Sequence, residues 1–303
     1  IHNNQDVYWM SRGLSQELMN VCKKNNIVLN GLEGTFVGCP HTLEEFSAIC
    51  KTWTTLEPRD YQIEAAWNII NRTWSTSELA TRAGKTLICS LVLRYMMEYK
   101  GIKKVLYIVP SIHLVKQGVK DLRDYMDFFG LGEVWAGSDV CGDENCIIGT
   151  LQSIVLRLDP QSKHYNPSFF DGIDLVLVDE AHKAKCKSIN IILQNLKGVQ
   201  MRFGVTGTVP KDKIDRYKVL SLLGPVIQTI GAHELIEEGF LAEAHIEQIH
   251  IHHKFDNCID ECEGLLFKDE IPLAIQKLKE RISPMEYQEY LIKSLGERCK
   301  IHV

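Results

Sequence analysis

The feature that most constrains the fold is an alternation of short apolar runs and longer helical patterns between about residues 56 and 253. Continuous apolar strands that alternate with helices indicate a parallel sheet covered by helices on both faces. We therefore expect an α/β fold. Its expected strands are residues 74–79, 105–109, 147–148, 175–178, 202–205 and 246–252.

The two flanking sections have different patterns. Residues 1–55 contain two short amphipathic helices and a short strand at residues 27–29, so we expect a small N-terminal α+β accessory domain. The second of these helices begins at Thr42, where Glu45 completes a capping box. Residues 254–303 are polar and helical, and they look like a linker. Because the chain lacks an initiating Met, we expect a processed or excised piece of a longer protein.

Composition and charge exclude several classes of protein. The 303 residues are 45% apolar and 24% charged, which is ordinary for a globular protein. No stretch approaches the roughly 18 uncharged apolar residues of a membrane span, and no signal peptide is visible. The net charge of −5 argues against coating nucleic acid by bulk charge, although a local basic groove is compatible with it. Ten cysteines without paired CxxC spacing indicate free thiols in a reducing compartment.

A phosphate-binding loop is indicated where the strand at residues 74–79 ends and the next helix opens. Backbone N–H groups in such a turn converge on a phosphate, and the helix dipole favours its negative charge. Lys85 can reach the β- and γ-phosphates of ATP, and the Thr86 hydroxyl can coordinate Mg²⁺. The whole segment is Ala80, Thr81, Arg82, Ala83, Gly84, Lys85 and Thr86.

A second segment with catalytic character follows the apolar run at residues 175–178. It reads Asp179, Glu180, Ala181 and His182. A carboxylate at the tip of a buried parallel strand lies where α/β sheets place their ligands. We expect Asp179 to hold Mg²⁺ and Glu180 to orient and deprotonate the attacking water.

These two segments and several others resemble the motifs of superfamily 2 helicases, in the correct order over residues 56–253. The segment at 80–86 is similar to motif I, 179–182 to motif II, and Thr206-Gly207-Thr208 to motif III. Pro58 to Gln62 resembles the upstream glutamine motif, residues 109–111 motif Ia, and residues 149–153 motif Ib. Residues 235–241 resemble the segment that ends the first motor domain.

Within this superfamily the chain is most similar to the UvsW-type phage recombination helicases. The shared features are the entry from Glu57 to Gln62, Leu79 before the phosphate loop, and a small N-terminal accessory domain. Arg82 departs from the pattern, since the family usually has a small residue there. Its guanidinium would either strengthen phosphate binding or crowd the loop, or it simply points to solvent.

The resemblance implies a RecA-like first motor domain at residues 56–253 and assigns roles within it. Gln62 would contact adenine with Arg59 nearby, and Lys85, Asp179 and Glu180 would carry ATP hydrolysis. His182, Thr206, Gly207 and Thr208 would couple loss of the γ-phosphate to nucleic acid. The implied nucleic-acid contacts are Pro110, Ser111, Gly149, Thr150, Gln152 and Ser153. The accessory domain at 1–55 would add a possible DNA contact.

No second motor-domain pattern and no motif VI arginine finger is visible after residue 253. The resemblance therefore implies that residues 254–303 lead to a second RecA-like domain absent from this chain. Because an arginine finger is worth about 10³–10⁵ in rate, we expect this chain alone to hydrolyse ATP poorly.

The implied function is that of an ATP- and Mg²⁺-dependent DNA helicase or translocase, acting on branched, forked or single-stranded DNA in recombination, repair or replication. A cytoplasmic location is expected, in a host cell if the protein is of phage origin. A restriction-type double-strand DNA translocase and an RNA helicase remain alternatives with the same core. A small-molecule kinase is disfavoured by the three helicase motifs, and a silent ATP-binding module by intact Lys85, Asp179 and Glu180.

Overall fold

The structure is a computed structural model that describes residues 2–3, 6–7, 10–28, 37–53, 56–126, 130–140, 144–185, 187–196 and 198–242. These residues belong to one compact unit, residues 1–243, and residues 244–303 form a second unit. The expected strand at 246–252 and the expected linker at 254–303 lie outside the described residues. Within the described ranges, no helix has the length and hydropathy that crossing a bilayer requires.

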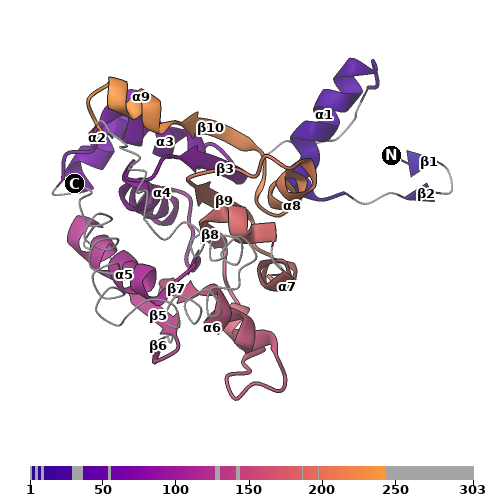
Figure 1. Cartoon of the computed structure of the whole chain (residues 1–303), viewed down its shortest axis with the longest axis vertical. Helices are drawn as coiled ribbons and strands as arrows, with labels where there is room; N and C mark the ends of the chain where they lie inside the picture. Colours follow the sequence, from indigo (N-terminus) through magenta and orange to yellow (C-terminus); the bar gives the residue numbers. More distant parts are fainter. Residues whose placement is uncertain are drawn as a thin grey trace, which may run out of the picture. The chain divides into compact units, whose positions relative to one another are not determined.

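An eight-stranded sheet forms the centre of the first unit, in the order β10-β3-β9-β8-β4-β7-β5-β6 (Figure 1). Its pairs are parallel, except that β6 runs antiparallel to β5. The strands are β3 (Trp74–Leu79), β4 (Val105–Val109), β5 (Leu131–Trp135), β6 (Ser138–Val140), β7 (Cys146–Thr150), β8 (Leu175–Asp179), β9 (Met201–Thr206) and β10 (Val226–Ile230). The expected α/β fold with a parallel sheet is confirmed, whereas β5, β6 and β10 were not anticipated.

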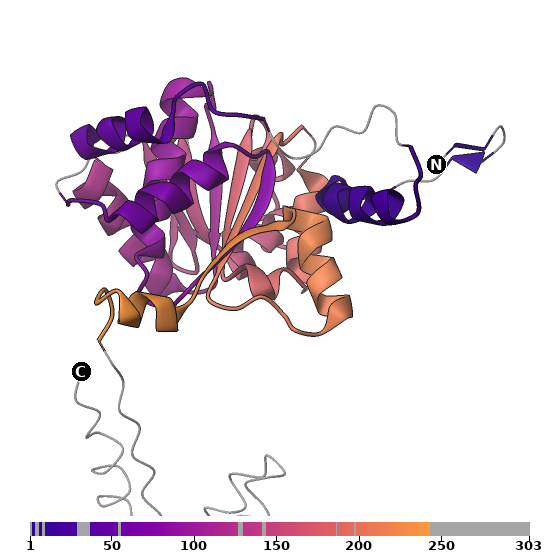
Figure 2. The ribbon, with the colours of Figure 1, turned by 90° about the horizontal axis from the view of Figure 1, so that it is seen from above.

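Helices cover both faces of this sheet (Figure 2). One face carries α2 (Leu43–Trp53), α3 (Asp60–Ile70), α4 (Lys85–Tyr99), α5 (Ile112–Met126) and α9 (Ala232–Glu237). The other face carries α6 (Leu151–Val155), α7 (Lys187–Asn195) and α8 (Lys213–Leu223). Successive residues of a strand point to opposite faces, so Leu106 and Ile108 of β4 enter one core and Val105 and Tyr107 the other.

The N-terminal section differs in part from its expectation. It contains β1 (His2–Asn3), β2 (Asp6–Val7), η1 (Arg12–Leu14) and α1 (Ser15–Lys24). The expected strand at residues 27–29 is wrong for Ile27 and Val28, which lie exposed after α1 without strand pairing. A side chain at Gly13 would meet the carbonyl oxygen of Leu220 at 2.0 Å, so η1 packs directly on α8.

Helix α2 shows a further difference from the expected division at residue 55. Its capping box is confirmed, since Glu45 accepts the Thr42 N–H at 2.8 Å and Thr42 Oγ1 accepts the Glu45 N–H at 3.2 Å. Phe46 and Cys50 are fully buried in the core that α3 and α4 also line. This helix is therefore part of the sheet domain, because the apolar face of α3 needs its cover.

Candidate nucleotide and nucleic-acid site

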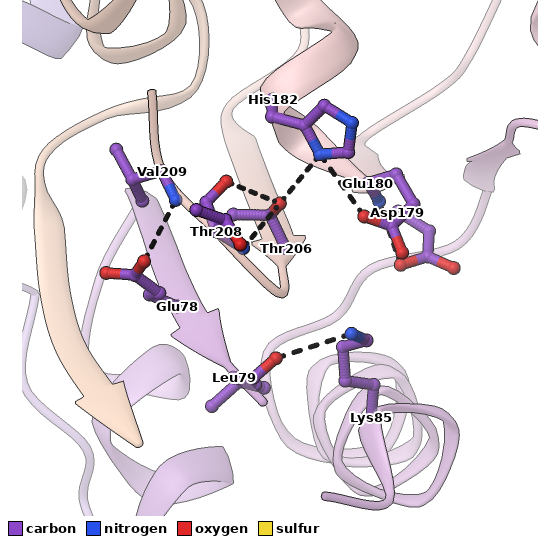
Figure 3. A network of polar contacts seen from close by, with 9 residues as sticks. All are labelled: Glu78, Leu79, Lys85, Asp179, Glu180, His182, Thr206, Thr208 and Val209. Atoms are coloured by element: carbon purple, nitrogen blue, oxygen red, sulfur yellow. Dashed lines mark hydrogen bonds and ion pairs between the residues drawn. The ribbon is translucent and has the colours of Figure 1, made fainter. Parts of the chain in front are cut away.

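The phosphate loop connects β3 to α4 at the carboxyl edge of the sheet, where parallel strands present their ligands. Two of its residues have left-handed backbone conformations, Gly84 with φ 76° and Arg82 with φ 67°. The Lys85 ammonium donates to the carbonyl oxygen of Leu79 at 3.3 Å, which holds it across the loop (Figure 3). The first turn of α4 therefore presents Lys85, the Thr86 hydroxyl and free N–H groups to an anion.

The glutamine motif packs against this loop. The Gln62 Nε2 donates to the carbonyl oxygen of Ala83 at 3.1 Å, and the Arg59 N–H donates to Gln62 Oε1 at 3.0 Å. The Tyr61 hydroxyl donates to the same Ala83 oxygen at 3.0 Å. Gln62 is buried, so its amide positions the loop and caps α3. Its predicted contact with adenine stays a prediction, since these bonds already occupy one donor and one acceptor of the amide.

Gly84 is the position where this packing is most sensitive. A Cβ there would lie 2.2 Å from Gln62 Nε2, and its φ is one that side chains rarely adopt. We expect Gly84→Ala to displace the Gln62 amide and to weaken binding of a fluorescent ATP analogue at least tenfold, about 1.4 kcal/mol. Gly101→Ala is the matched control, because Gly101 also has a positive φ of 68° but nothing within 4 Å. An equal loss of ATP-analogue binding in both variants would show that backbone strain, and not contact with Gln62, causes the loss.

Arg59 and Tyr61 also meet the end of the described chain. The Arg59 guanidinium lies 4.8 Å from the centre of the Phe240 ring and donates to the Phe240 carbonyl oxygen at 3.2 Å. The Tyr61 and Phe240 rings are 5.2 Å apart. Phe240 is held by its own N–H, which donates to the Leu235 oxygen at 2.8 Å. The segment 235–241 thus closes the outer side of the glutamine motif.

Asp179 and Glu180 lie at the end of β8, where the sheet edge turns into η4 (Ala181–Lys185). Asp179 Oδ1 accepts the Glu180 N–H at 2.8 Å, and Glu180 has a φ of 51°. A left-handed conformation costs a residue of this kind about 1–3 kcal/mol and is found mostly at functional sites. Burial raises the pKa of the Asp179 carboxyl above its usual value, and Lys85 is near enough to oppose that rise.

His182 joins Glu180 to Thr206. Its Nδ1 lies 3.2 Å from Glu180 Oε2 and 3.0 Å from Thr206 Oγ1 (Figure 3). The Thr206 hydroxyl gives its hydrogen to the Thr208 carbonyl oxygen at 3.0 Å. His182 Nδ1 must then be the donor, and its one hydrogen is shared between the Glu180 carboxylate and the Thr206 oxygen. A shift of Thr206 would therefore alter how firmly Glu180 is held.

The loop after β9 also touches the phosphate loop. A Cβ at Gly207 would lie 3.6 Å from both Lys85 Nζ and Thr81 Oγ1. Motifs I, II and III are thus brought together at the ends of three adjacent strands, β3, β9 and β8. The sidechain of Arg82 is exposed, as is that of Thr81. Of the loop residues predicted to bind ATP, Gly84, Lys85 and Thr86 are half-buried, and the Lys85 ammonium lies beside Gly207.

Glu78 is a site residue that the sequence analysis missed. Its Oε1 accepts the Val209 N–H at 3.0 Å, and its Oε2 accepts the Thr229 hydroxyl at 3.3 Å. It therefore ties β3 to the loop after β9 on one side and to β10 on the other. The one available signal was a carboxylate inside a strand directly before the phosphate loop.

The donor set at the loop suits Mg²⁺, which prefers hard oxygen ligands. The Thr86 hydroxyl lies in the first turn of α4 and the Asp179 carboxylate at the end of β8, and both are oxygen ligands. Among the described residues, no group of three or more His, Cys, Asp or Glu side chains is gathered as a metal site. The set therefore fits an ion held partly by nucleotide phosphates and water.

The predicted nucleic-acid contacts follow β4 and β7, which are neighbours in the sheet. Ser111 and Gln152 are exposed, and Pro110 and Ser153 are half-buried. Thr150 is buried, and its hydroxyl oxygen accepts the Ser153 N–H at 3.3 Å as the cap of α6. Gly149 is buried, with Val134 O 3.1 Å from a Cβ placed there. Thr150 and Gly149 thus shape the turn, and direct contacts with nucleic acid remain predictions for all six residues.

Comparison with known proteins agrees with this arrangement. The family model described as "Type III restriction enzyme, res subunit" matches residues 55–211. The chain is similar to the ATP-dependent DNA helicase uvsW of Enterobacteria phage T4, with 28% identity over 226 residues, 72% of this chain and 43% of that protein. It is also similar to the DNA 3'-5' translocase XPB2 of Sulfurisphaera tokodaii, with 25% identity over 198 residues, 65% of this chain and 40% of that protein.

A solved structure supports the fold. The crystal structure of the UvsW helicase from bacteriophage T4 aligns with a TM-score of 0.62 and 22% sequence identity, over 72% of this chain and 78% of that chain. The chain spans less than half the length of the curated relatives named above, 43% and 40%.

Proposed function

The chain belongs to the type III restriction enzyme res subunit family, and from that membership we propose that it is the ATP-binding motor portion of an ATP-dependent DNA helicase or translocase. The observation that carries the proposal is the convergence of Lys85, Glu180 and the His182–Thr206 link at adjacent strand ends. The relatives named above are a DNA helicase and a DNA translocase. ATP is thus the proposed substrate of this site.

In the proposed reaction, Lys85 binds the β- and γ-phosphates and the N–H groups of the loop orient them. The Glu180 carboxylate takes a proton from water as the water oxygen bonds to the γ-phosphorus and the bond to the bridging oxygen breaks, which yields ADP and phosphate. Mg²⁺ bound by Thr86 and Asp179 would neutralise charge on the phosphate oxygens. Arg59 and Gln62 are the proposed neighbours of the adenine.

Coupling to nucleic acid is proposed to run through the shared hydrogen of His182. Loss of the γ-phosphate changes the surroundings of Lys85 and of Gly207, which lies beside it. The loop after β9 can then shift, and Thr206 and Thr208 move with it. Because Thr206 and Glu180 compete for the His182 N–H, the position of this loop and the catalytic carboxylate depend on one another.

A second RecA-like domain is proposed to complete the ATP site with an arginine finger, and residues 254–303 to lead toward it. The section before residue 55 is proposed as an accessory contact for DNA. The proposed location is the cytoplasm. The match to a restriction-enzyme family favours tracking along duplex DNA as the second candidate function; displacement of a third strand from a triplex would distinguish it from strand separation.

DNA binding tests the proposal directly. We expect the chain to bind single-stranded, duplex and forked DNA weakly and without sequence preference, since the predicted contacts offer small polar groups to the backbone. Affinity should fall with salt by about 0.7–0.9 in log–log slope for each phosphate neutralised. Fluorescence anisotropy at two salt concentrations measures this. A preference for the fork would support action on branched DNA, and absence of binding to all three at low salt would contradict the motor.

A further inference from the structure

A pocket of about 440 Å³ opens at the end of β5, beside the predicted nucleic-acid contacts and apart from the phosphate loop. Trp135 of β5 and Asp139 of β6 line it, together with Ser153 of α6 and Arg157 of η2 (Leu156–Leu158). Lys163 and His164, from the loop that follows η2, also belong to the lining. Three separate segments of the chain thus contribute to one concave surface.

The order of the strands places this pocket on the same edge as the motor motifs. β8, β4, β7 and β5 are consecutive neighbours and parallel, so their carboxyl ends lie in a row. The first three ends carry the Asp179 segment, Pro110–Ser111 and Thr150–Ser153. The pocket at the end of β5 is the next place in that row, and it shares Ser153 with the predicted contact before it.

The charges that line the pocket favour an anion. Arg157 pairs with Asp139, so these two groups cancel. Lys163 and His164 are exposed, and neither side chain makes a hydrogen bond or ion pair to another described residue. Nearby, Lys116 lies 4.6 Å from the centre of the Trp135 ring, and the Trp135 Nε1 donates to Glu133 at 2.9 Å. Lys116 and Glu133 carry opposite charges beside the same ring. The side chains of Lys163 and His164 are thus two donors of the lining without a partner among the described residues.

The part of the lining formed by Arg157 is rigidly built. The Arg157 side chain is only 7% exposed, and its guanidinium lies 5.3 Å from the centre of the Phe169 ring. Its Nε has no hydrogen-bond partner among the described residues. Burying a guanidinium with an unmet donor costs free energy, and the ion pair with Asp139 holds β6 against η2. This part of the lining, which Lys163 and His164 share, is therefore fixed in place.

We propose that this pocket binds a backbone phosphate of the DNA strand, one step beyond the contact predicted for the Thr150–Ser153 turn. The proposal rests on the proposed DNA motor function and extends it, because it adds a contact outside the helicase motifs. Lys163 and His164 donate to the phosphate oxygens, and the strand runs along the row of strand ends from β4 to β5. The contact reads the backbone and is indifferent to base sequence.

The test is anisotropy of a labelled single-stranded oligonucleotide with the full chain carrying Lys163→Gln and His164→Gln together. Both side chains are exposed, so the substitution removes no buried contact. We expect roughly three- to tenfold weaker binding at low salt, and a log–log salt slope smaller by about 0.7. Lys103→Gln is the matched control: it removes the same formal charge from an exposed lysine beside the amino end of β4, on the opposite edge of the sheet.

The outcomes separate the two levels of the proposal. Unchanged affinity in the double variant, or an equal loss in Lys103→Gln, would overturn the pocket and leave the motor function standing. Absence of DNA binding by the unaltered chain would overturn the motor function itself. Binding of a fluorescent ATP analogue must be the same in all three proteins, and a loss of it in the double variant would show that the change acts on the whole domain and not on the pocket.

Discussion

Glu180→Gln should slow ATP hydrolysis by about 10²–10⁴-fold, the range that general-base catalysis supplies. The amide cannot take the proton of the attacking water, while it keeps the size of the carboxylate and can still accept from His182 Nδ1, now 3.2 Å from Glu180 Oε2. Binding of ATP should be unchanged, since Glu180 is not among the groups that hold the phosphates. Single-turnover hydrolysis of labelled ATP, with the protein and DNA in excess, measures even a slow reaction.

Glu44→Gln provides the matched control. It makes the same chemical change at an exposed residue in the first turn of α2, outside the group of residues at the strand ends. It should hydrolyse ATP like the unaltered chain. We also expect the unaltered chain to turn over well below the enzyme median of about 10 s⁻¹, because no arginine finger is predicted in it. A rate in Glu180→Gln equal to that of the control would remove Glu180 from the reaction.

Lys85→Ala should weaken binding of MgATP by roughly 10- to 150-fold, which corresponds to the 1.5–3 kcal/mol of a hydrogen bond to a charged group. The ammonium is half-buried, and its hydrogen bond is to the Leu79 carbonyl oxygen, so its loss should hardly change the fold. Titration with a fluorescent ATP analogue measures the affinity, and urea unfolding verifies stability.

Lys103→Ala serves as the control for this titration, since it removes an exposed lysine from the opposite edge of the sheet. Equal affinities of Lys85→Ala and of the control for the ATP analogue would contradict the assignment of the phosphate loop. The two catalytic-site variants also differ in kind: Lys85→Ala should lose binding, and Glu180→Gln should bind ATP but fail to hydrolyse it. That contrast checks the division of roles between the end of β3 and the end of β8.

The sequence by itself determined the features that depend on neighbours along the chain. The strands at residues 74–79 and 105–109 have the predicted bounds, because each is a short run of residues that ends where the next turn begins. The capping box of α2 is equally local, since it depends on two residues three positions apart. The phosphate loop and the carboxylates at 179–180 follow from the same kind of spacing.

Only the tertiary structure decided which groups meet across the sheet. Gln62 reaches Ala83, Glu78 joins the Val209 N–H to Thr229, and Arg59 meets Phe240, all through strand order and the packing of α3 and α9. The half-buried pattern of β10 does not predict its place beside β3. The pocket at β5 exists because three short segments between residues 134 and 164 converge. Periodicity reports which face of an element is buried, but strand order and the contacts between distant side chains follow from the free energy of the whole packed domain.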